Sequence, residues 1–283
     1  METIKGKRIL VVGMARSGIA AAKILKHLGA EVIVNDIKTK DMLGCEVDEL
    51  ENMGIEMCLG TNPDSVIDRI DCIMLSPGVP IDLPFIKKAR GNGVYITGEI
   101  ELAYRLCAAP IVAITGTNGK TTTTSLTGEI FKNAGMHTHV VGNIGFPFIE
   151  NVMKIRPDDI VVAEISSFQL ETADRFKPKV SAILNITEDH LNRHKSMENY
   201  INIKSGIFKN QDKDDWVVLN ADDKLTASLA DKVKGRLIFF SRKQVLDQGA
   251  WVENGKIFAR IDGIKPCEIC GIDEIFIPGA HNL

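Results

Sequence analysis

Short apolar runs separated by glycine turns and helix-like segments recur along the chain. Residues 8–13 and 31–36 are mostly apolar and end in Gly13 and in Asp36, and residues 17–28 between them place apolar side chains at helical spacing. This pattern predicts a strand, a helix and a second strand. Residues 72–76 predict another strand, which ends in a Ser-Pro-Gly turn. The first hundred residues therefore predict a Rossmann-like α/β domain.

The remainder of the chain predicts a second α/β domain with a parallel sheet. Near-continuous apolar runs alternate with helical segments, which indicates strands that are covered on both faces. These runs are residues 111–115, 159–164, 179–187, 215–220 and 236–241. Near the end of the chain, Asn254-Gly255 lies between two short alternating runs and predicts a β-hairpin.

A glycine-rich turn joins the predicted strand 111–115 to a helix that should end near Gly135. Glycines allow backbone N–H groups to face an anion, and the helix N-terminus and a lysine add positive charge. A turn that only joined two elements would not need a lysine, a threonine and two glycines here. We therefore expect a nucleoside triphosphate to bind at Gly116, Thr117, Asn118, Gly119, Lys120, Thr121 and Thr122, with the Thr121 hydroxyl on Mg²⁺.

The spacing of this loop separates it from the common phosphate-binding loop, in which a glycine stands five residues before the Gly-Lys pair. Ile114 occupies that position, inside the predicted strand. A kinase or GTPase with a full-length loop is therefore not favoured.

The first glycine turn leaves three interpretations open. Gly13 and Gly18 fit a dinucleotide fingerprint, and Asp36 follows at the distance of its acidic residue. Ala15, however, stands where a second glycine would let a pyrophosphate approach closely. Taken alone, the turn fits NAD binding, UDP-sugar binding or simple packing equally well.

Composition excludes several classes of protein. The chain has 283 residues, of which 45% are hydrophobic and 25% charged, and a net charge of −3. These values are typical of a globular protein with room for two domains, and they give no reason to expect a nucleic-acid partner. No apolar run is long enough to span a membrane, and no signal peptide is present, so we expect a cytoplasmic protein without a membrane partner.

Cys267 and Cys270 form a lone pair and are interpreted as incidental thiols.

Polar residues at the carboxyl ends of predicted strands are candidates for chemistry, because ligands of open α/β sheets gather there. Glu164 ends an apolar strand, and a magnesium ion would stabilise such a buried acid. His190 and Asn143 fit either a binding role or a local structural role. Lys204, on a helix capped by Ser196, would ordinarily be an exposed charge.

Several motifs resemble the Mur ligase superfamily, ATP-dependent enzymes that build the peptide stem of peptidoglycan, with folylpolyglutamate synthetases as relatives. They are the loop 115–121, the Gly-Asn-Ile-Gly segment 142–145, the segment 164–171, the segment 185–190, and a tyrosine and lysine at 200 and 204. The sequence Ser-Ser-Phe-Gln-Leu-Glu at 166–171 is similar to that of the members that add D-glutamate.

The resemblance implies roles for individual residues. Lys120, Glu164, His190 and Lys204 would be catalytic, and two magnesium ions would be bound by Thr121, Glu164, His190 and a carbamylated Lys204. Substrate would contact Ser17 at the diphosphate, Asp36 at the uracil, Ser76 at the sugar-peptide part, and Asn143 and Ser166. Asn282, in a Gly-x-His-Asn segment, would contact ATP. The implied reaction joins D-glutamate to UDP-N-acetylmuramoyl-L-alanine through an acyl phosphate.

The resemblance also implies a domain organisation. Residues 1–98 would bind the UDP substrate, and residues 99–283 would form the central ATP-binding domain. The family's third domain would be absent, so we expect weak nucleotide binding and little turnover from this chain alone. We also expect a monomer. An NAD-dependent oxidoreductase leaves the loop 115–121 unexplained, and a folylpolyglutamate synthetase would lack the uridine-type first domain. A non-catalytic nucleotide-binding fragment stays open.

Overall fold

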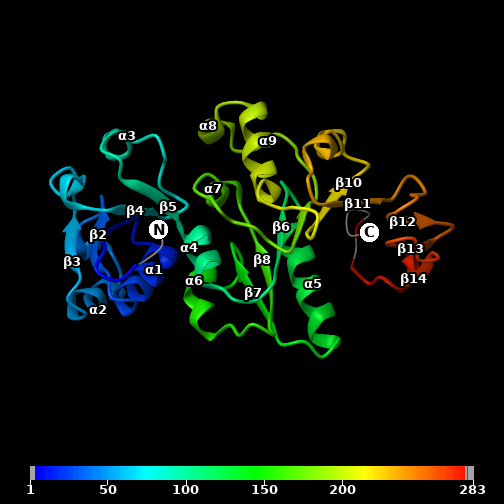
Figure 1. Ribbon diagram of the computed structural model, residues 1–283, viewed down its shortest axis with the longest axis horizontal. Coiled ribbons are helices and arrows are strands. Elements are labelled where there is room, and N and C mark those ends of the chain that lie inside the picture. The colour runs from blue at the N-terminus through cyan, green and yellow to red at the C-terminus, as the bar shows by residue number, and fades with distance from the viewer. Residues whose placement is uncertain (1–3, 278, 280–283) are drawn as a thin grey trace. The chain divides into compact units, whose positions relative to one another are not determined.

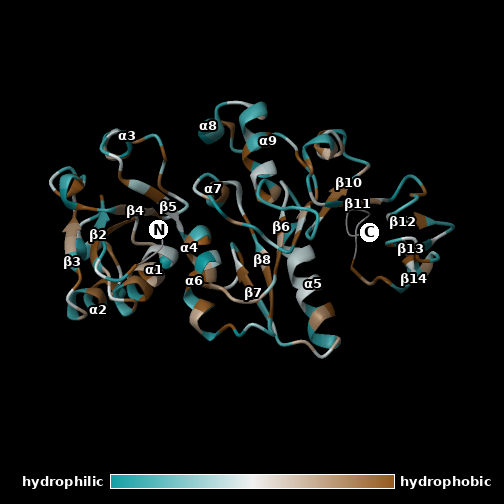
Figure 2. Cartoon of the chain, viewed as in Figure 1, coloured by the Kyte–Doolittle hydropathy of each residue, from teal (hydrophilic) through white to brown (hydrophobic). Residues whose placement is uncertain are grey.

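The computed structural model describes residues 4–277 and residue 279. It divides into two compact units that are interleaved in sequence. The first unit contains residues 1–108, 141–156 and 168–176, and the second contains residues 109–140, 157–167 and 177–283. Hydrophobic residues are concentrated in the strands, whereas the connecting loops are largely hydrophilic (Figure 2). In the described part of the chain, no helix is long and apolar enough to cross a membrane.

The first unit is built on a five-stranded parallel sheet with the strand order β3-β2-β1-β4-β5 (Figure 1). The predicted strand, helix and strand are present as its first three elements, and the Ser-Pro-Gly turn follows β4 as predicted. Its elements are β1 (Arg8–Val12), α1 (Arg16–His27), β2 (Glu31–Asp36), α2 (Glu46–Asn52), β3 (Glu56–Leu59), β4 (Cys72–Leu75), α3 (Pro84–Gly91), β5 (Tyr95–Gly98), α4 (Glu99–Leu106) and α6 (Phe148–Asn151).

Close backbone packing fixes the start of α1. A Cβ on Gly18 would lie 1.9 Å from the carbonyl oxygen of Gly13, so only glycine fits at this position. The Ser76 hydroxyl donates a hydrogen bond to the same Gly13 carbonyl across 2.7 Å. The first glycine turn is thereby held between α1 and the end of β4.

Two buried glutamates tie later segments of the chain to the first unit. Glu101 accepts hydrogen bonds from the backbone N–H groups of residues 174, 175 and 176, at 2.9–3.0 Å. Glu99 accepts from the Ile149 N–H at 2.8 Å and from the Gln169 amide at 3.2 Å, and burial raises the pKa of the Glu99 carboxyl. These contacts explain why residues 141–156 and 168–176 belong to the first unit.

The second sheet has nine strands in the order β14-β13-β12-β11-β10-β9-β6-β8-β7. Strands β8, β6, β9, β10, β11 and β12 pair in parallel, as predicted for this region, and β13 and β14 extend the sheet as antiparallel strands. The strands are β6 (Ile111–Thr115), β7 (Thr138–Gly142), β8 (Ile160–Glu164), β9 (Val180–Ile183), β10 (Trp216–Asn220), β11 (Arg236–Ser241), β12 (Gly249–Glu253), β13 (Lys256–Arg260) and β14 (Cys267–Gly271). The helices of the second unit are α5 (Lys120–Asn133), α8 (Leu191–His194), α9 (Met197–Ser205) and α10 (Lys224–Ala227), whereas α7 (Ser167–Leu170) lies almost entirely in the first unit.

Two local predictions for this part of the chain are confirmed. Asn254 and Gly255 both have positive φ, at 50° and 74°, as a tight hairpin turn between β12 and β13 requires. The Ser196 hydroxyl caps α9 by accepting a hydrogen bond from the Asn199 N–H across 3.1 Å.

Candidate active site

The glycine-rich turn lies between the carboxyl end of β6 and the start of α5 (Figure 1). Gly119 has a φ of 81° at the N-cap of α5, a left-handed conformation that glycine adopts without strain. The Lys120 ammonium folds back over the turn and donates to the carbonyl oxygens of Gly116 and Thr117, at 3.0 and 2.8 Å. The turn therefore presents a helix N-terminus and a lysine at one point.

Thr121 and Glu164 meet beside this turn. The Thr121 hydroxyl donates to Glu164 Oε2 across 2.8 Å, and Glu164 ends β8, next to β6 in the sheet. The Glu164 side chain is almost completely buried. Two residues from separate parts of the sequence thus place oxygen atoms together at the mouth of the glycine-rich turn.

Residues that sequence reasoning did not assign to the site brace the turn from the segment after β9. The Asn185 amide accepts from the Asn118 N–H at 2.8 Å and donates to the Asn118 carbonyl at 3.0 Å. The Thr117 hydroxyl lies 3.2 Å from the Thr187 carbonyl and 3.3 Å from the Tyr200 hydroxyl. The sequence shows that the segment after β9 is rich in polar residues, but it does not show which residues of the turn they contact.

Lys204 is buried, which corrects the physical expectation of an exposed charge. Its side chain is 1% exposed, its ammonium donates to the Gly116 carbonyl at 2.8 Å, and it lies 4.8 Å from the centre of the Tyr200 ring. Burial, together with the nearby charge of Lys120, lowers the pKa of Lys204 to about 7. The amine is therefore partly neutral near pH 7, and a neutral amine is the form that reacts with CO₂.

His190, Ser166 and Thr122 are the other predicted site residues that the structure describes in the second unit. His190 has a left-handed backbone with a φ of 51°, and its half-exposed ring lies 3.4 Å from the Asp189 carboxylate. Ser166 follows β8 by two residues, and Thr122 is exposed on the first turn of α5. Asn282 lies outside the residues that the structure describes.

Four of the predicted substrate-binding residues line one cavity of about 400 Å³ in the first unit. They are Ser17, Asp36, Ser76 and Asn143. The cavity lies against the first glycine turn and the Ser-Pro-Gly turn, at the carboxyl ends of β1, β2 and β4. This is the edge of a parallel sheet where ligands bind. Asn143 reaches it because residues 141–156 belong to this unit.

Asp36 also has a structural role at this cavity. Its carboxylate accepts hydrogen bonds from the Met14 N–H at 2.8 Å and from the Lys38 N–H at 2.9 Å. The Arg16 guanidinium, which was not predicted, donates to the Gly145 carbonyl at 3.1 Å and so holds the segment after β7 beside α1. Side chains at this cavity thus fix the backbone that shapes it.

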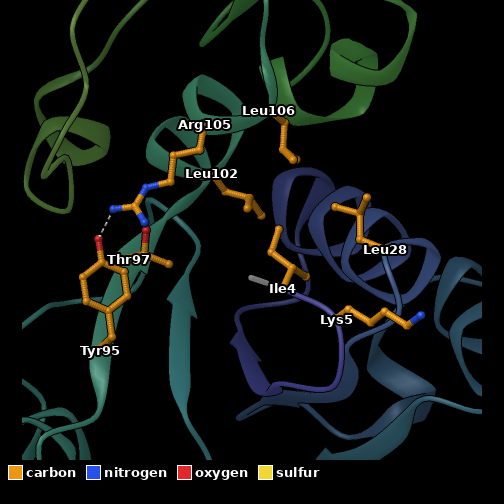
Figure 3. A pocket seen from close by; sticks show the side chains of 8 residues that line it. All are labelled: Ile4, Lys5, Leu28, Tyr95, Thr97, Leu102, Arg105 and Leu106. Atoms are coloured by element: carbon orange, nitrogen blue, oxygen red, sulfur yellow. Dashed lines mark hydrogen bonds between the residues drawn. The ribbon is translucent and has the colours of Figure 1, made fainter. Parts of the chain in front are cut away.

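A second cavity of about 280 Å³ lies elsewhere in the first unit (Figure 3). Ile4, Leu28, Leu102 and Leu106 give it largely apolar walls. Figure 3 shows the Arg105 guanidinium directed at the Tyr95 hydroxyl. Because Arg105 also pairs with the buried carboxylate of Glu101 at 2.7 Å, its charge is already compensated within the protein.

The donor set beside the glycine-rich turn fits a magnesium ion. Thr121 and Glu164 supply hard oxygen atoms, and Glu164 is a buried acid that a divalent cation would neutralise. Carbamylation would turn Lys204 into an oxygen-bearing anion, for which its lowered pKa is suited. His190 would be a nitrogen ligand, which magnesium accepts less readily than oxygen.

Two protein-family models match this chain. "Mur ligase middle domain" matches residues 114–283, and "Mur ligase MurD-like, N-terminal domain" matches residues 7–98. The chain is 51% identical over 280 residues to the UDP-N-acetylmuramoylalanine–D-glutamate ligase of Thermoanaerobacter sp. (strain X514). It is 51% identical over 282 residues to the ligase of the same name from Clostridioides difficile (strain 630). Each match covers 99% of this chain, which spans 62% of the length of these relatives.

Solved structures show the same fold. The UDP-N-acetylmuramate:L-alanyl-gamma-D-glutamyl-meso-diaminopimelate ligase from Neisseria meningitides matches with a TM-score of 0.61 and 17% identity, covering 98% of this chain and 90% of that chain. The UDP-N-acetylmuramate-alanine ligase MurC from Thermotoga maritima matches with a TM-score of 0.52 and 24% identity, covering 98% and 62%. Because the middle-domain match alone spans more than half of the sequence, this chain belongs to the Mur ligase family.

Proposed function

We propose that this chain carries the ATP site and the UDP-substrate site of a ligase that joins D-glutamate to UDP-N-acetylmuramoyl-L-alanine. The observation that carries the proposal is the contact between Thr121 and Glu164 at the mouth of the turn that Lys120 crosses. The names of relatives that are about half identical to this chain support the choice of substrates. The proposal divides the chain into a UDP-substrate domain, residues 1–98, and an ATP-binding domain, residues 99–283.

The chemistry requires two anions to react. The substrate carboxylate would attack the γ-phosphorus of ATP, so that a carboxylate-oxygen-to-phosphorus bond forms and the bond to the bridging oxygen breaks as ADP leaves. The amine of D-glutamate would then attack the acyl carbon, phosphate would leave, and the amine would lose a proton. The first step is opposed by repulsion between the carboxylate and the phosphates, and both steps require the reactants to be held in line. A protein can supply electrostatic stabilisation and positioning for such steps.

Lys120 would leave the carbonyl oxygens of Gly116 and Thr117 and pair with the β- and γ-phosphates. The N–H groups of the turn and the first turn of α5, including Thr122, would hold the remaining phosphate oxygens. Asn185 would keep the turn in the shape that aims these groups at one point.

Two magnesium ions are part of the proposal, and they would neutralise phosphate charge when bound. Thr121 and Glu164 would hold one of them, and His190 and carbamylated Lys204 would help to hold the second. Asn282 would contact ATP. Ser17, Asp36, Ser76, Asn143 and Ser166 would contact the UDP substrate. We further propose a monomer that acts in the cytoplasm.

Thermal unfolding with separate ligands tests this function against its rival, an NAD-dependent oxidoreductase. UDP-N-acetylmuramoyl-L-alanine and Mg·ATP should each raise the melting temperature, because a ligand that binds only the folded state stabilises it by mass action. NADH should not raise it. Stabilisation by NADH, with no effect of the other two ligands, would favour the oxidoreductase.

A further inference from the structure

Two histidines and an aspartate form a cluster that the proposed reaction does not use. His137 Nδ1 lies 3.0 Å from Asp159 Oδ1, and His139 Nε2 lies 2.8 Å from Asp159 Oδ2. One ligand atom from each of the three side chains lies within 4.8 Å of the others. The two rings meet edge to face, with their centroids 4.8 Å apart.

The fold explains why these residues meet. His137 directly precedes β7 and His139 is the second residue of that strand, so the two-residue spacing of an extended backbone directs both side chains to the same face. Asp159 directly precedes β8, the neighbour of β7 in the sheet. The Ile160 N–H donates to the His137 carbonyl at 2.9 Å, which fixes the two strand starts side by side.

This cluster is separate from the proposed magnesium site. Asp159 and Glu164 stand at opposite ends of β8, and five residues of strand span about 16 Å. An ion bound at the cluster would therefore contact neither the phosphate-binding turn nor its ligands.

We propose that His137, His139 and Asp159 bind a divalent transition-metal ion of the zinc type. Two imidazoles and a carboxylate are a common ligand set for zinc, whereas magnesium prefers oxygen ligands. Ligands about 2.1 Å from a tetrahedral ion lie about 3.4 Å apart, so the cluster needs only small side-chain shifts to admit one. The side chain of Asp159 is 5% exposed, and a cation would neutralise this buried carboxylate.

Access and coordination number agree with this assignment. The His137 side chain is 73% exposed and the His139 side chain 16% exposed, so an ion can enter from the solvent side. Three protein ligands leave a fourth position of a zinc ion for water or another small ligand. Without a metal, the same residues form a hydrogen-bonded cluster in which Asp159 accepts from both rings, and this is the alternative that an experiment must distinguish.

The experiment uses the whole 283-residue chain with Cys267 and Cys270 replaced by serine, so that this thiol pair cannot bind the probe. Metal-free protein is titrated with Zn²⁺ by calorimetry in saturating Mg²⁺, and with Co²⁺ by visible absorption, which reports coordination geometry. We expect one Zn²⁺ per chain, and at least a tenfold loss of affinity in H137A and in H139A. H27Q, which changes an exposed histidine of α1, should bind like the parent.

Each outcome decides the proposal. Loss of Zn²⁺ affinity in both cluster variants, with Mg·ADP binding unchanged, supports it. Equal Zn²⁺ affinity in the parent, H137A and H139A would overturn it, as would no saturable binding below about 1 mM Zn²⁺. H137A changes an exposed side chain and should fold normally, so a folding defect in H139A would leave the test intact.

Discussion

The Thr121 hydroxyl donates a hydrogen bond to Glu164 across 2.8 Å, and this contact joins the first turn of α5 to the end of β8. The two residues are more than forty positions apart in the sequence. Their contact follows from the order of the strands, since β8 lies next to β6, which leads into the glycine-rich turn.

This contact gives the first prediction. T121V removes the hydroxyl while keeping the side-chain volume. The Mg²⁺ concentration needed for half-maximal ADP binding should therefore rise about tenfold or more, because the variant loses one ligand oxygen that contributes about 1.5 kcal/mol to Mg²⁺ binding. T121S keeps the hydroxyl and should behave like the parent. The measurement is fluorescence or calorimetric titration of ADP at a series of Mg²⁺ concentrations. An unchanged Mg²⁺ requirement in T121V would contradict the magnesium assignment.

The brace from Asn185 gives the second prediction. N185A removes two hydrogen bonds to the Asn118 backbone, so it should lower the free energy of unfolding by about 1–3 kcal/mol and weaken Mg·ADP binding. N133A changes an exposed asparagine at the far end of α5 and should leave nucleotide affinity unchanged. Chemical denaturation and calorimetry measure the two effects. If N185A bound nucleotide like N133A, the shape of the turn would not depend on this brace.

Lys204 gives a prediction for the effect of pH on stability. Its pKa in the folded chain is about 7, against an ordinary value of 10.5, so between these two pH values the unfolded chain binds more protons. Stability should therefore rise with pH across this window in wild type relative to K204M. The cost of the buried charge is fully present below about pH 7 and disappears as the pH approaches 10.5.

The measurement is urea unfolding of wild type and K204M between pH 6 and 9.5 in CO₂-free buffer, which keeps the amine uncarbamylated. Comparison with K204M removes the contributions of all other groups. A difference in stability that is constant with pH would show that the amine titrates near its ordinary value.

Gly18 gives a prediction for the first unit. A Cβ in G18A would lie 1.9 Å from the Gly13 carbonyl oxygen, so the start of α1 would have to move and the melting temperature should fall by several degrees. G91A is the matched control, because a Cβ at this last residue of α3 meets nothing within 4 Å. G91A should be neutral or slightly stabilising. Equal melting temperatures for the two variants would refute the packing account.

Local patterns predicted much of the fold. Apolar runs located β1, β2 and β4 of the first sheet and β6, β8, β9, β10 and β11 of the second, and Asn254-Gly255 located the hairpin between β12 and β13. They did not locate β3, β5, β7 and β14. The association of residues 141–156 and 168–176 with the first unit was not predictable, because it depends on buried contacts of Glu99 and Glu101 with distant backbone N–H groups. Periodicity shows that a segment is buried, but not which core buries it.

The same limit applies to the site. The glycine-rich turn and its lysine could be located because they lie in consecutive residues, 116–121, and phosphate binding there stays a prediction. Asn185 and Tyr200 were not assigned a role because they contact the turn from distant parts of the sequence, through contacts that only the tertiary structure creates. Burial of Lys204 likewise depends on how α9 packs, since its own sequence predicts an exposed lysine.

Nucleotide binding to the phosphate-binding turn tests the central claim most directly. Calorimetric titration of wild type, K120A and K132A with Mg·ADP compares two lysines of the same helix, of which Lys132 is an exposed residue paired with Glu129. Loss of a charge-assisted hydrogen bond of about 1.5–3 kcal/mol should weaken binding to K120A by about ten- to a hundredfold. K132A should bind like wild type. Equal affinity for Mg·ADP in K120A and K132A would contradict the account.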